Sequence, residues 1–456
     1  MDSTVSMTTS RNLIVDYYDL IPAAIARCAP PPAGASGTPS FAPAFDLPAL
    51  TDDVRRFFAP ATGGWRRLGE YGGHPIQFLD LTGNPGTRTT KTFASLVMVA
   101  RAVEHIRRTG EAIRIFTPTS ANKGIALRDA VGRAIEAGLV KPDQLSVVVL
   151  APAATRHKFR HDRLAGDPAL RAANPLLRYV GGAAEGVKAL GRAFVDKYAA
   201  EAYDRYGMNL WYSLDLRNYL VADAVRAAFE ADVSPTSAAP PRWHAHSVSS
   251  AYGLLGYNLG RDVLEAAGRA QPTDRPGFLL VQHLGTPDMV LSLRHGGFSR
   301  AKMPAYRLDP ASGLSVQDAD PRFPAVTDDP AEVLDPTFYT HEPATSPSMN
   351  ELIRRFGGDG IVVSRRECLQ RYPMLREWLN GDRPMLPADP DELREWSIVM
   401  GLTGVLNAID RGLVPEGHEV VLHGSGCYGG SDFVPAEPDA EVSTIDDVAA
   451  VVWADR

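Results

Sequence analysis

The chain has 456 residues, of which 45% are hydrophobic and 22% are charged. These proportions are ordinary for a globular protein and exclude a collagen, a coiled coil and wholesale disorder. The length predicts two or three domains, each with a core of its own. The net charge is −7, from 47 Lys and Arg against 54 Asp and Glu. Such a balance argues against nucleic acid as the main partner, because a phosphate backbone requires a basic face.

The three cysteines, at positions 28, 368 and 427, are far apart and form no CxxC pair. Their number and spacing argue against a disulfide framework or a zinc ribbon, so we expect no bound metal and a cytoplasmic location. The polar N-terminus lacks the apolar stretch of a signal peptide. No run of about 18 apolar residues occurs, so we expect no membrane partner.

Residues 1–70 are predicted to form an N-terminal helix and a Pro-rich arm. Apolar side chains recur at helical spacing within residues 11–28, and residues 29–50 are rich in Pro, Ala, Gly and Ser. A second Pro-rich stretch, residues 303–347, contains many acidic residues and few periodic apolar positions. We expect this stretch to be a long excursion over the surface.

Strands and helices alternate through most of the remaining chain. The first predicted helix runs from Lys91 to Thr109 and ends at Gly110, a residue typical of a left-handed C-cap. The predicted strands are 112–116, 145–151, 176–180, 210–213, 243–248, 278–283 and 419–423, and further helices include 124–137 and 391–411. This alternation predicts an α/β fold with open, mostly parallel sheets flanked by helices.

Parallel sheets bind ligands at the carboxyl ends of their strands, so the loops after strands are the candidate sites. One turn-rich stretch, Leu81 to Thr90, places Lys91 at the start of a helix. The positive end of the helix dipole disfavours a charged lysine there and favours loss of its proton, which a nucleophilic amine requires. The alternative is a solvated lysine on a surface helix.

Three further loops contain small or hydroxylated residues. Two of them join a strand to a helix, and the third follows a strand. The loop Thr119-Ser120-Ala121-Asn122 can offer backbone N–H groups to a carboxylate or phosphate, or it can be a plain capping loop. Ser249, Ser250 and Gly253 at a helix start suit a phosphate. Ser425, flanked by glycines after the last strong strand, can approach a ring nitrogen closely.

The order of these parts resembles the fold type II pyridoxal-phosphate (PLP) enzymes, the superfamily of the tryptophan synthase β chain. Within it the chain is most similar to threonine synthase. The Asn84-Pro85 turn that leads to Lys91 is similar to that family's lysine motif. The family's asparagine loop matches at Ser120, Asn122, Gly124 and Ala126. The resemblance covers roughly residues 70–435 and depends on the order of the motifs.

The chain departs from the family pattern at several positions. Lys91 lies one residue further from the Asn-Pro turn, and Ala121 stands where the family has Gly. The segment Ser249 to Gly256 replaces the family's glycine-rich phosphate loop. Additional Cβ atoms crowd a backbone that must approach phosphate closely. Either the phosphate sits differently or the site is degenerate.

The resemblance implies two domains with PLP in the cleft between them. Residues 71–110 and 216–456 would form the larger, PLP-binding α/β domain, and residues 111–215 a smaller, mobile α/β domain. It also implies a homodimer.

The resemblance further assigns roles to the candidate residues. Lys91 would bind PLP covalently and, once released by the amino-acid substrate, act as general base. The expected cofactor contacts are Asn122 to the ring hydroxyl, Ser425 to the ring nitrogen, and Ser249, Ser250 and Gly253 to the phosphate. Substrate contacts are expected from Thr119, Ser120, Ala121 and Lys158. Lys158 lies in a basic segment, residues 155–163, which would receive an anionic leaving group or simply be a solvated helix face.

Three functions follow from these assignments. A neutral hydroxyl at the ring nitrogen favours elimination or replacement at the β or γ carbon of an amino acid, in specialised amino-acid or natural-product biosynthesis. The chain would then be a PLP-dependent lyase or transferase. One alternative is threonine synthase proper, acting on O-phosphohomoserine. The other is a non-catalytic scaffold that retains the fold.

Overall fold

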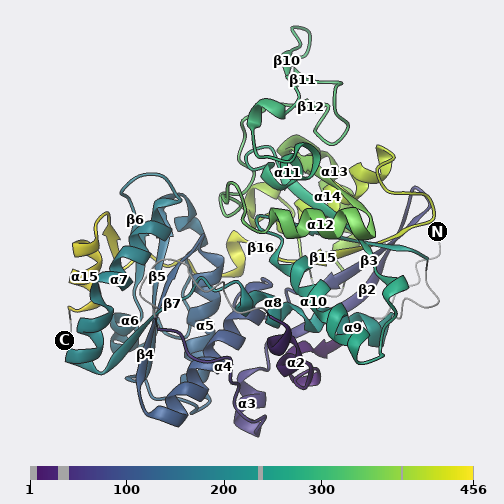
Figure 1. Cartoon of the computed structure of the whole chain (residues 1–456). Helices are drawn as coiled ribbons and strands as arrows, with labels where there is room; N and C mark the ends of the chain where they lie inside the picture. Colours follow the sequence, from purple (N-terminus) through teal and green to yellow (C-terminus); the bar gives the residue numbers. More distant parts are fainter. Residues whose placement is uncertain (1–7, 29–40, 235–239, 382–383, 455–456) are drawn as a thin grey trace. The chain divides into compact units, whose positions relative to one another are not determined.

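The computed structural model describes residues 8–28, 41–234, 240–381 and 384–454 (Figure 1). The chain divides into two compact units, which alternate along the sequence. The first unit comprises Met1–Leu13, Thr62–Gly83 and Asp223–Asp432, and the second comprises Ile14–Ala61, Asn84–Ala222 and Phe433–Arg456. Residues 29–40 of the predicted Pro-rich arm lie outside the described residues.

The first unit contains a seven-stranded sheet. Its order is β1 (Thr9–Asn12), β2 (Thr62–Tyr71), β3 (His74–Asp80), β15 (Glu419–Gly424), β8 (Arg242–Ser247), β9 (Gly277–His283) and β13 (Gly358–Val363). The first three strands pair antiparallel, and the strands from β3 to β13 are all parallel. The parallel strands are almost wholly buried, as expected for strands covered on both faces.

The core of the first unit lies between this sheet and a helix that crosses it. That helix, α14 (Ser397–Asp410), packs against β8, β9, β13 and β15. A Cβ on Gly404 would lie 2.4 Å from Val281 Cγ1 of β9, so a glycine lets the helix approach the sheet closely. The unit's other long helices are α9 (Val225–Val233), α10 (Tyr252–Ala266), α11 (Asp288–His295), α12 (Ser346–Phe356) and α13 (Arg365–Leu379).

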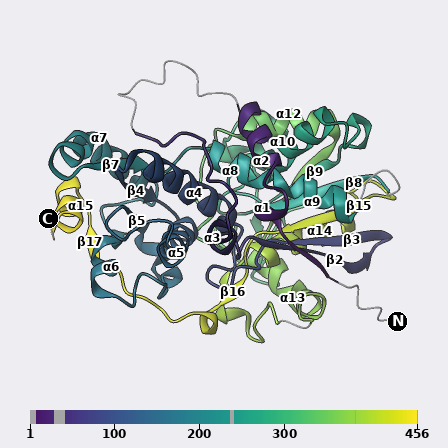
Figure 2. The same cartoon turned by 90° about the horizontal axis from the view of Figure 1, so that it is seen from below.

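The second unit contains a five-stranded parallel sheet (Figure 2). Its order is β17 (Ala440–Val442), β6 (Leu176–Tyr179), β5 (Leu145–Pro152), β4 (Ala112–Pro118) and β7 (Met208–Tyr212). The helices of this unit include α4 (Lys91–Thr109), α5 (Asn122–Glu136), α6 (Pro168–Ala173), α7 (Gly186–Tyr206) and α15 (Ile445–Val452), and α8 (Arg217–Asp223) ends where the first unit resumes. Helix α4 ends at Gly110, whose φ of 76° confirms the predicted left-handed C-cap. In the described part of the chain, no helix is both long and apolar enough to cross a membrane.

The two units differ from the predicted domain boundaries. Helix α4, expected in the larger domain, belongs to the second unit because it packs along α5. The C-terminal residues also belong there, since β17 pairs with β6 and Trp453 stacks on Phe194 of α7 at 6.3 Å. The described residues 8–28 and 41–70 are shared between the units and do not form a segment apart.

The structure corrects two element predictions. The expected helix over residues 11–28 is strand β1 followed by two short helices, α1 (Leu13–Asp16) and α2 (Leu20–Arg27), because Thr9–Asn12 pairs with β2. The expected helix over 391–411 begins only at Ser397. The residues before Ser397 form a 3-10 helix (Pro390–Glu392) and strand β14 (Leu393–Glu395), which pairs with β16 (Tyr428–Gly429).

The Pro-rich stretch of residues 303–347 is only in part a surface excursion. It contains three two-residue strands, β10 (Arg307–Leu308), β11 (Ser315–Val316) and β12 (Val326–Thr327), which project from the first unit in Figure 1. Further along, Leu334 and Phe338 return to the core of that unit. The stretch is therefore anchored by apolar side chains at its C-terminal half.

Candidate functional site

Lys91 is the first residue of α4, as predicted, and its N-cap residue is Thr90. Its side chain is half-buried, unlike the fully solvated lysine of the alternative interpretation. The Nζ atom lies 5.7 Å from the centre of the Tyr219 ring on α8. The lysine therefore has an aromatic neighbour that can stabilise a positive charge.

The turn before Lys91 is held by the side chain of Asn84. Its Oδ1 accepts a hydrogen bond from the Gly86 N–H at 2.9 Å. Its Nδ2 donates to Thr92 Oγ1 at 3.1 Å and to Asp129 Oδ2 of α5 at 3.0 Å. Arg88, in the same turn, adopts a left-handed backbone with a φ of 50°.

The loop from Thr119 to Asn122 joins β4 to α5. Thr119 Oγ1 accepts hydrogen bonds from the N–H groups of Ala121 (3.2 Å) and Gly124 (3.3 Å). Thr119 thus holds the loop together, while Ser120 is half-buried and Asn122 begins the helix. A Cβ on Gly124 would lie 2.4 Å from Val149 Cγ1, so glycine is required where α5 approaches β5.

Lys123, which no sequence motif indicated, follows Asn122 in the first turn of α5. Its side chain is buried, and its Nζ donates to Ser213 O at 2.6 Å and to Ser213 Oγ at 2.9 Å. The same Nζ lies 5.4 Å from the centre of the Tyr219 ring. Burial, followed by the charge of Lys91, lowers the pKa of Lys123 to about 7. The second unit thus brings two lysines to one tyrosine.

An ion pair that acts on Lys123 joins the loop after β7 to the first residue of α8. Asp215 and Arg217 are 2.7 Å apart. Burial alone would raise the pKa of Asp215, but hydrogen bonds from Arg217 outweigh it and hold the pKa below its ordinary value. Asp215 therefore remains a carboxylate and offsets part of the positive charge around Lys123.

In the first unit, the predicted phosphate loop joins β8 to α10. Ser249 and Ser250 are half-buried, and Gly253 is buried in the first turn of the helix. The hydroxyl oxygen of Ser249 is shielded from solvent and makes no hydrogen bond to the described residues. A Cβ on Gly253 would lie 2.5 Å from Arg226 Nη1 and 3.0 Å from His246 Nε2. A guanidinium and an imidazole therefore lie against the start of α10.

Arg226 is held by a chain of buried side chains. It pairs with Asp223 at 2.6 Å, and its Nη1 donates to His423 Nδ1 at 3.1 Å. Because arginine can only donate, His423 carries its proton on Nε2 and donates to His244 Nδ1 at 2.7 Å. His244 then carries its proton on Nε2, which lies 3.2 Å from Glu230 Oε1. Burial keeps the pKa of His423 well below its usual value, so this ring is neutral.

Ser425 lies in the loop that follows β15, and it is 9% exposed. The first turn of α14 joins this loop to the end of β8: Ile398 N–H donates to Gly426 O at 3.2 Å, and Ser247 Oγ donates to Ser397 O at 2.6 Å. The first unit thus brings the Ser425 loop and the β8–α10 loop to neighbouring strand ends.

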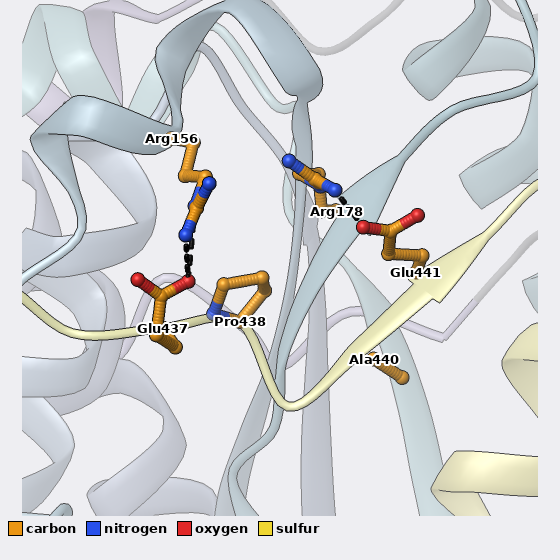
Figure 3. A pocket seen from close by; sticks show the side chains of 6 residues that line it. All are labelled: Arg156, Arg178, Glu437, Pro438, Ala440 and Glu441. Carbon is orange, nitrogen blue, oxygen red and sulfur yellow. Dashed lines mark hydrogen bonds and ion pairs between the residues drawn. The ribbon is translucent and has the colours of Figure 1, made fainter.

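The basic segment over residues 155–163 does not form one surface. Lys158 is buried at the end of a 3-10 helix, Ala153–Lys158. Arg156 is exposed and pairs with Glu437. Figure 3 shows the pocket beside it, where Arg156 faces Glu437 and Arg178 faces Glu441. Both arginines have acidic partners, so this pocket offers no net positive charge to an anion.

The side chains of His283 and Cys427 are both used for hydrogen bonds within the first unit. His283 Nδ1 accepts from the Gly285 N–H at 3.1 Å. Its Nε2 contacts Thr286 Oγ1, also at 3.1 Å. Cys427 is buried, and its thiol donates to Met385 O at 3.0 Å. No group of three or more His, Cys, Asp or Glu side chains that could hold a metal ion occurs among the described residues.

A family model described as "Family of unknown function (DUF6002)" matches residues 9–456. The chain belongs to this family. No curated protein matches the chain. Among solved structures, threonine synthase from Escherichia coli is 14% identical with a TM-score of 0.52, over 84% of this chain and 78% of that one. Threonine synthase from yeast is 12% identical with a TM-score of 0.50, over 88% and 83% of the two chains.

At such identities the likeness shows the fold alone, and it is the fold that the sequence motifs implied. The predicted α/β class with mostly parallel sheets is therefore confirmed. Two alanines, in the loops before α5 and α10, have a backbone conformation that is unusual for alanine. Ala121 has a φ of 94° and Ala251 a φ of 51°, values that favour glycine. The backbone at both loops is thus glycine-like although the side chain is not.

Replacing Ala121 or Ala251 by Gly should change the free energy of unfolding by less than about 1 kcal/mol, because relief of the left-handed backbone offsets the loss of a buried methyl group. The left-handed backbone costs alanine about 1–2 kcal/mol, which exceeds the roughly 0.5–1 kcal/mol that glycine loses in conformational entropy. Ala200, exposed in the middle of α7, is the matched control. Ala200→Gly should lower the free energy by about 1 kcal/mol in urea titrations. Equal losses at all three positions would contradict the account of strain.

Proposed function

We propose that the chain is a PLP-dependent enzyme acting on an amino acid, and that Lys91 is the amine that binds the cofactor. The observation that carries the proposal is the placement of the motifs. Lys91, Asn122 and Gly253 lie in the first turns of α4, α5 and α10, and Ser425 follows the end of β15. Helix starts and strand ends are where an α/β fold presents ligand-binding groups.

The residues of the first unit fit the cofactor's phosphate. Because residue 253 has no Cβ, the Arg226 guanidinium and the His246 imidazole can lie against the backbone at the start of α10. The helix terminus and the Arg226 guanidinium both favour a negative charge there. The buried hydroxyl of Ser249 can donate a further hydrogen bond. Ser250 would contribute in the same way from the neighbouring position.

When bound, PLP supplies an electron sink for the negative charge that develops at an amino acid's α-carbon. The chain's own residues would bind and orient the substrate and the cofactor, and would transfer the protons. The Lys91 amine would take the α-proton. Asn122 would donate to the ring hydroxyl, and Ser425 would meet the ring nitrogen as a neutral hydroxyl.

The substrate contacts would come from the loop before α5. The backbone at Ser120 and Ala121, at the positive end of the helix, would bind the α-carboxylate. Thr119 would act indirectly, since its hydroxyl oxygen holds the N–H groups of the loop. Lys158, buried in the same unit, would receive an anionic leaving group.

We further propose that the reaction is an elimination or replacement at the β or γ carbon, because a neutral partner at the ring nitrogen leaves the ring less electrophilic than a carboxylate would. Threonine synthase proper, acting on O-phosphohomoserine, is one form of this reaction. The enzyme would serve specialised amino-acid or natural-product biosynthesis as a cytoplasmic homodimer. A non-catalytic scaffold is the second candidate, favoured by the two alanines in glycine-like positions.

Loss of the α-proton of an amino acid in deuterated water tests the proposal. The protein, saturated with PLP, is incubated with a panel that includes O-phosphohomoserine, and the α-hydrogen signals are followed by NMR. We expect exchange with at least one amino acid, and phosphate release would identify the threonine synthase reaction. Lys91→Ala should abolish the exchange, while Lys141→Ala, at an exposed position, should not. Bound PLP without any exchange would favour the scaffold.

A further inference from the structure

His341 and Asp288 form a pair in the first unit, at the edge of its sheet where the parallel strands end. Asp288 is the first residue of α11, which follows β9, and its side chain is only 5% exposed. The Nδ1 atom of His341 lies 3.3 Å from Asp288 Oδ2 and 3.4 Å from Asp288 Oδ1. The His341 side chain is 48% exposed. A buried carboxylate thus holds an imidazole that is half open to solvent.

The pair fixes the tautomer of His341. Because carboxylate oxygens can only accept a hydrogen bond, the neutral imidazole carries its proton on Nδ1 and donates it to Asp288. The lone pair is then on Nε2, which is what a general base requires. Contacts of this kind are often long in the absence of a substrate and become shorter when it binds.

The backbone next to His341 is strained. Glu342 has a φ of 46°, and the residue that follows it is Pro343. A side chain disfavours the left-handed conformation, and a residue before proline is normally extended. The N–H of Glu342 donates to Asp288 Oδ1 at 3.0 Å. The strained residue is therefore the one whose backbone joins the His341 loop to Asp288, and strain of this kind is concentrated at functional sites.

The His341 loop lies at the same edge of the sheet as the proposed phosphate contacts. Strands β8 and β9 are parallel neighbours, and Ser250 and Asp288 follow their carboxyl ends. Thr345, four residues after His341, donates from its Oγ1 to Ser250 O at 2.7 Å. This edge is where an α/β fold binds its ligands. The pair is therefore part of the candidate site that the first unit contributes.

The other ionisable groups nearby are used by the fold. Asp335 accepts a backbone N–H at 3.2 Å, and Arg300 donates to two backbone carbonyl oxygens after β9 at 3.1 Å. His283 senses the charges of both groups and of His341, but its ring is buried and hydrogen-bonded at both nitrogens. In this group of side chains, His341 has the imidazole that a substrate can reach.

We propose that His341 is a second base of the enzyme and takes the proton of the nucleophile that enters at the β or γ carbon of the substrate. Asp288 is its positioning residue. Lys91 keeps its proposed role at the α-proton, so the two bases act on different protons. The inference rests on the proposed function and commits it to replacement at the β or γ carbon, in contrast to simple elimination.

The step balances in atoms and electrons. The O–H or S–H bond of the nucleophile breaks, its electron pair forms the new bond to carbon, and its proton goes to His341 Nε2. The leaving group departs with the electron pair of its own bond to carbon. The imidazolium is stabilised by the Asp288 carboxylate until it returns the proton to the leaving group or to water.

The first measurement is the tautomer of His341 in the protein without cofactor, by NMR after labelling histidine with ¹⁵N. His341→Asn identifies the signal. We expect the proton on Nδ1 in the natural protein. In Asp288→Asn, the remaining oxygen keeps the Glu342 N–H, so the amide nitrogen faces His341 and donates to Nδ1. The His341 proton should then move to Nε2. A proton on Nε2 in the natural protein would overturn the proposal.

The second measurement compares two rates in the protein saturated with PLP, with O-phosphohomoserine and O-phosphoserine as probes. NMR in deuterated water follows exchange of the α-proton. Mass spectrometry in water enriched in ¹⁸O, with and without 2-mercaptoethanol, follows an amino acid with ¹⁸O in its hydroxyl group or a thioether. His341→Asn keeps an N–H for Asp288 but has no base. This variant and Asp288→Asn should form product about 100-fold more slowly, with α-proton exchange nearly unchanged.

His295→Gln, at an exposed position at the end of α11, is the matched control and should change neither rate. Thermal unfolding checks that each variant folds. A product rate unaffected by His341→Asn, an equal loss of both rates, or exchange without any product in the natural protein would overturn this inference alone. Absence of α-proton exchange in the natural protein would overturn the proposed function and this inference with it.

Discussion

Replacing Glu230 by Gln should lower the free energy of unfolding by about 3–5 kcal/mol, as expected when one partner of a buried ion pair is removed. Glu230 is 1% exposed and lies 2.8 Å from Arg242 Nη1 and 3.2 Å from His244 Nε2, and it also accepts a hydrogen bond from Tyr257. Burial alone would raise the pKa of Glu230, but its partners, His244 first, outweigh it and lower the pKa to about 2. The carboxylate is thus fully charged at neutral pH.

The matched control for this prediction is Glu201, which pairs with Arg205 on the surface of α7. Both glutamates lie on helices and face an arginine, but the Glu201 pair is solvated. Glu201→Gln should change the free energy by less than about 1 kcal/mol. Urea titration at pH 7.5 measures both variants. Similar losses for the two would show that the Glu230 network does not carry the stability assigned to it.

Lowering the pH from about 6.5 to 4 should reduce the free energy of unfolding by about 3 kcal/mol through protonation of His283 alone. Burial lowers the pKa of His283 to about 4, against about 6.5 in an unfolded chain. Thr286 Oγ1 donates to Phe338 O, so His283 holds its proton on Nε2 and uses Nδ1 as an acceptor for the Gly285 N–H. A second proton would break that hydrogen bond.

The free energy of unfolding increases with pH here because the buried base has a lowered pKa. Between pH 4 and 6.5 the unfolded state binds a proton on His283 that the folded state does not bind. Stability therefore rises with pH, and the contribution of His283 is complete above about pH 6.5. His423, also buried and neutral, acts in the same direction. Between pH 7 and 5, His283→Gln should lose about 2 kcal/mol less than the natural protein. His157→Gln, at an exposed position, should leave the pH dependence unchanged.

Local patterns in the sequence located the lysine, the asparagine loop and most strands, because each depends on residues that are close in sequence. The start of α4 at Lys91 and its end at Gly110 are of this kind. The alanines at 121 and 251 are not, since a left-handed alanine is tolerated only where the surrounding fold fixes it. Both side chains are almost completely buried, which explains why the glycine-like backbone survives the substitution.

Local sequence patterns did not reveal Lys123, nor the series of hydrogen-bonded buried side chains that begins at Arg226. The reasoning that selected Lys91, an amine in the first turn of a helix after a strand, applies equally to Lys123, and only its burial against Ser213 distinguishes it. Arg226, His244 and His423 come from α9, β8 and β15. The pairing of β15 with β8 places the two histidines within hydrogen-bond distance, and such pairing is not visible in any local pattern.

Lys91 is proposed as the amine that binds PLP. The most direct test is to saturate the protein with PLP, reduce it with borohydride, and map the labelled peptide by mass spectrometry. The account predicts a visible absorption band before reduction and a pyridoxyl group on Lys91 afterwards. A label on Lys123, Lys158 or any other lysine, or no label at all, would contradict it.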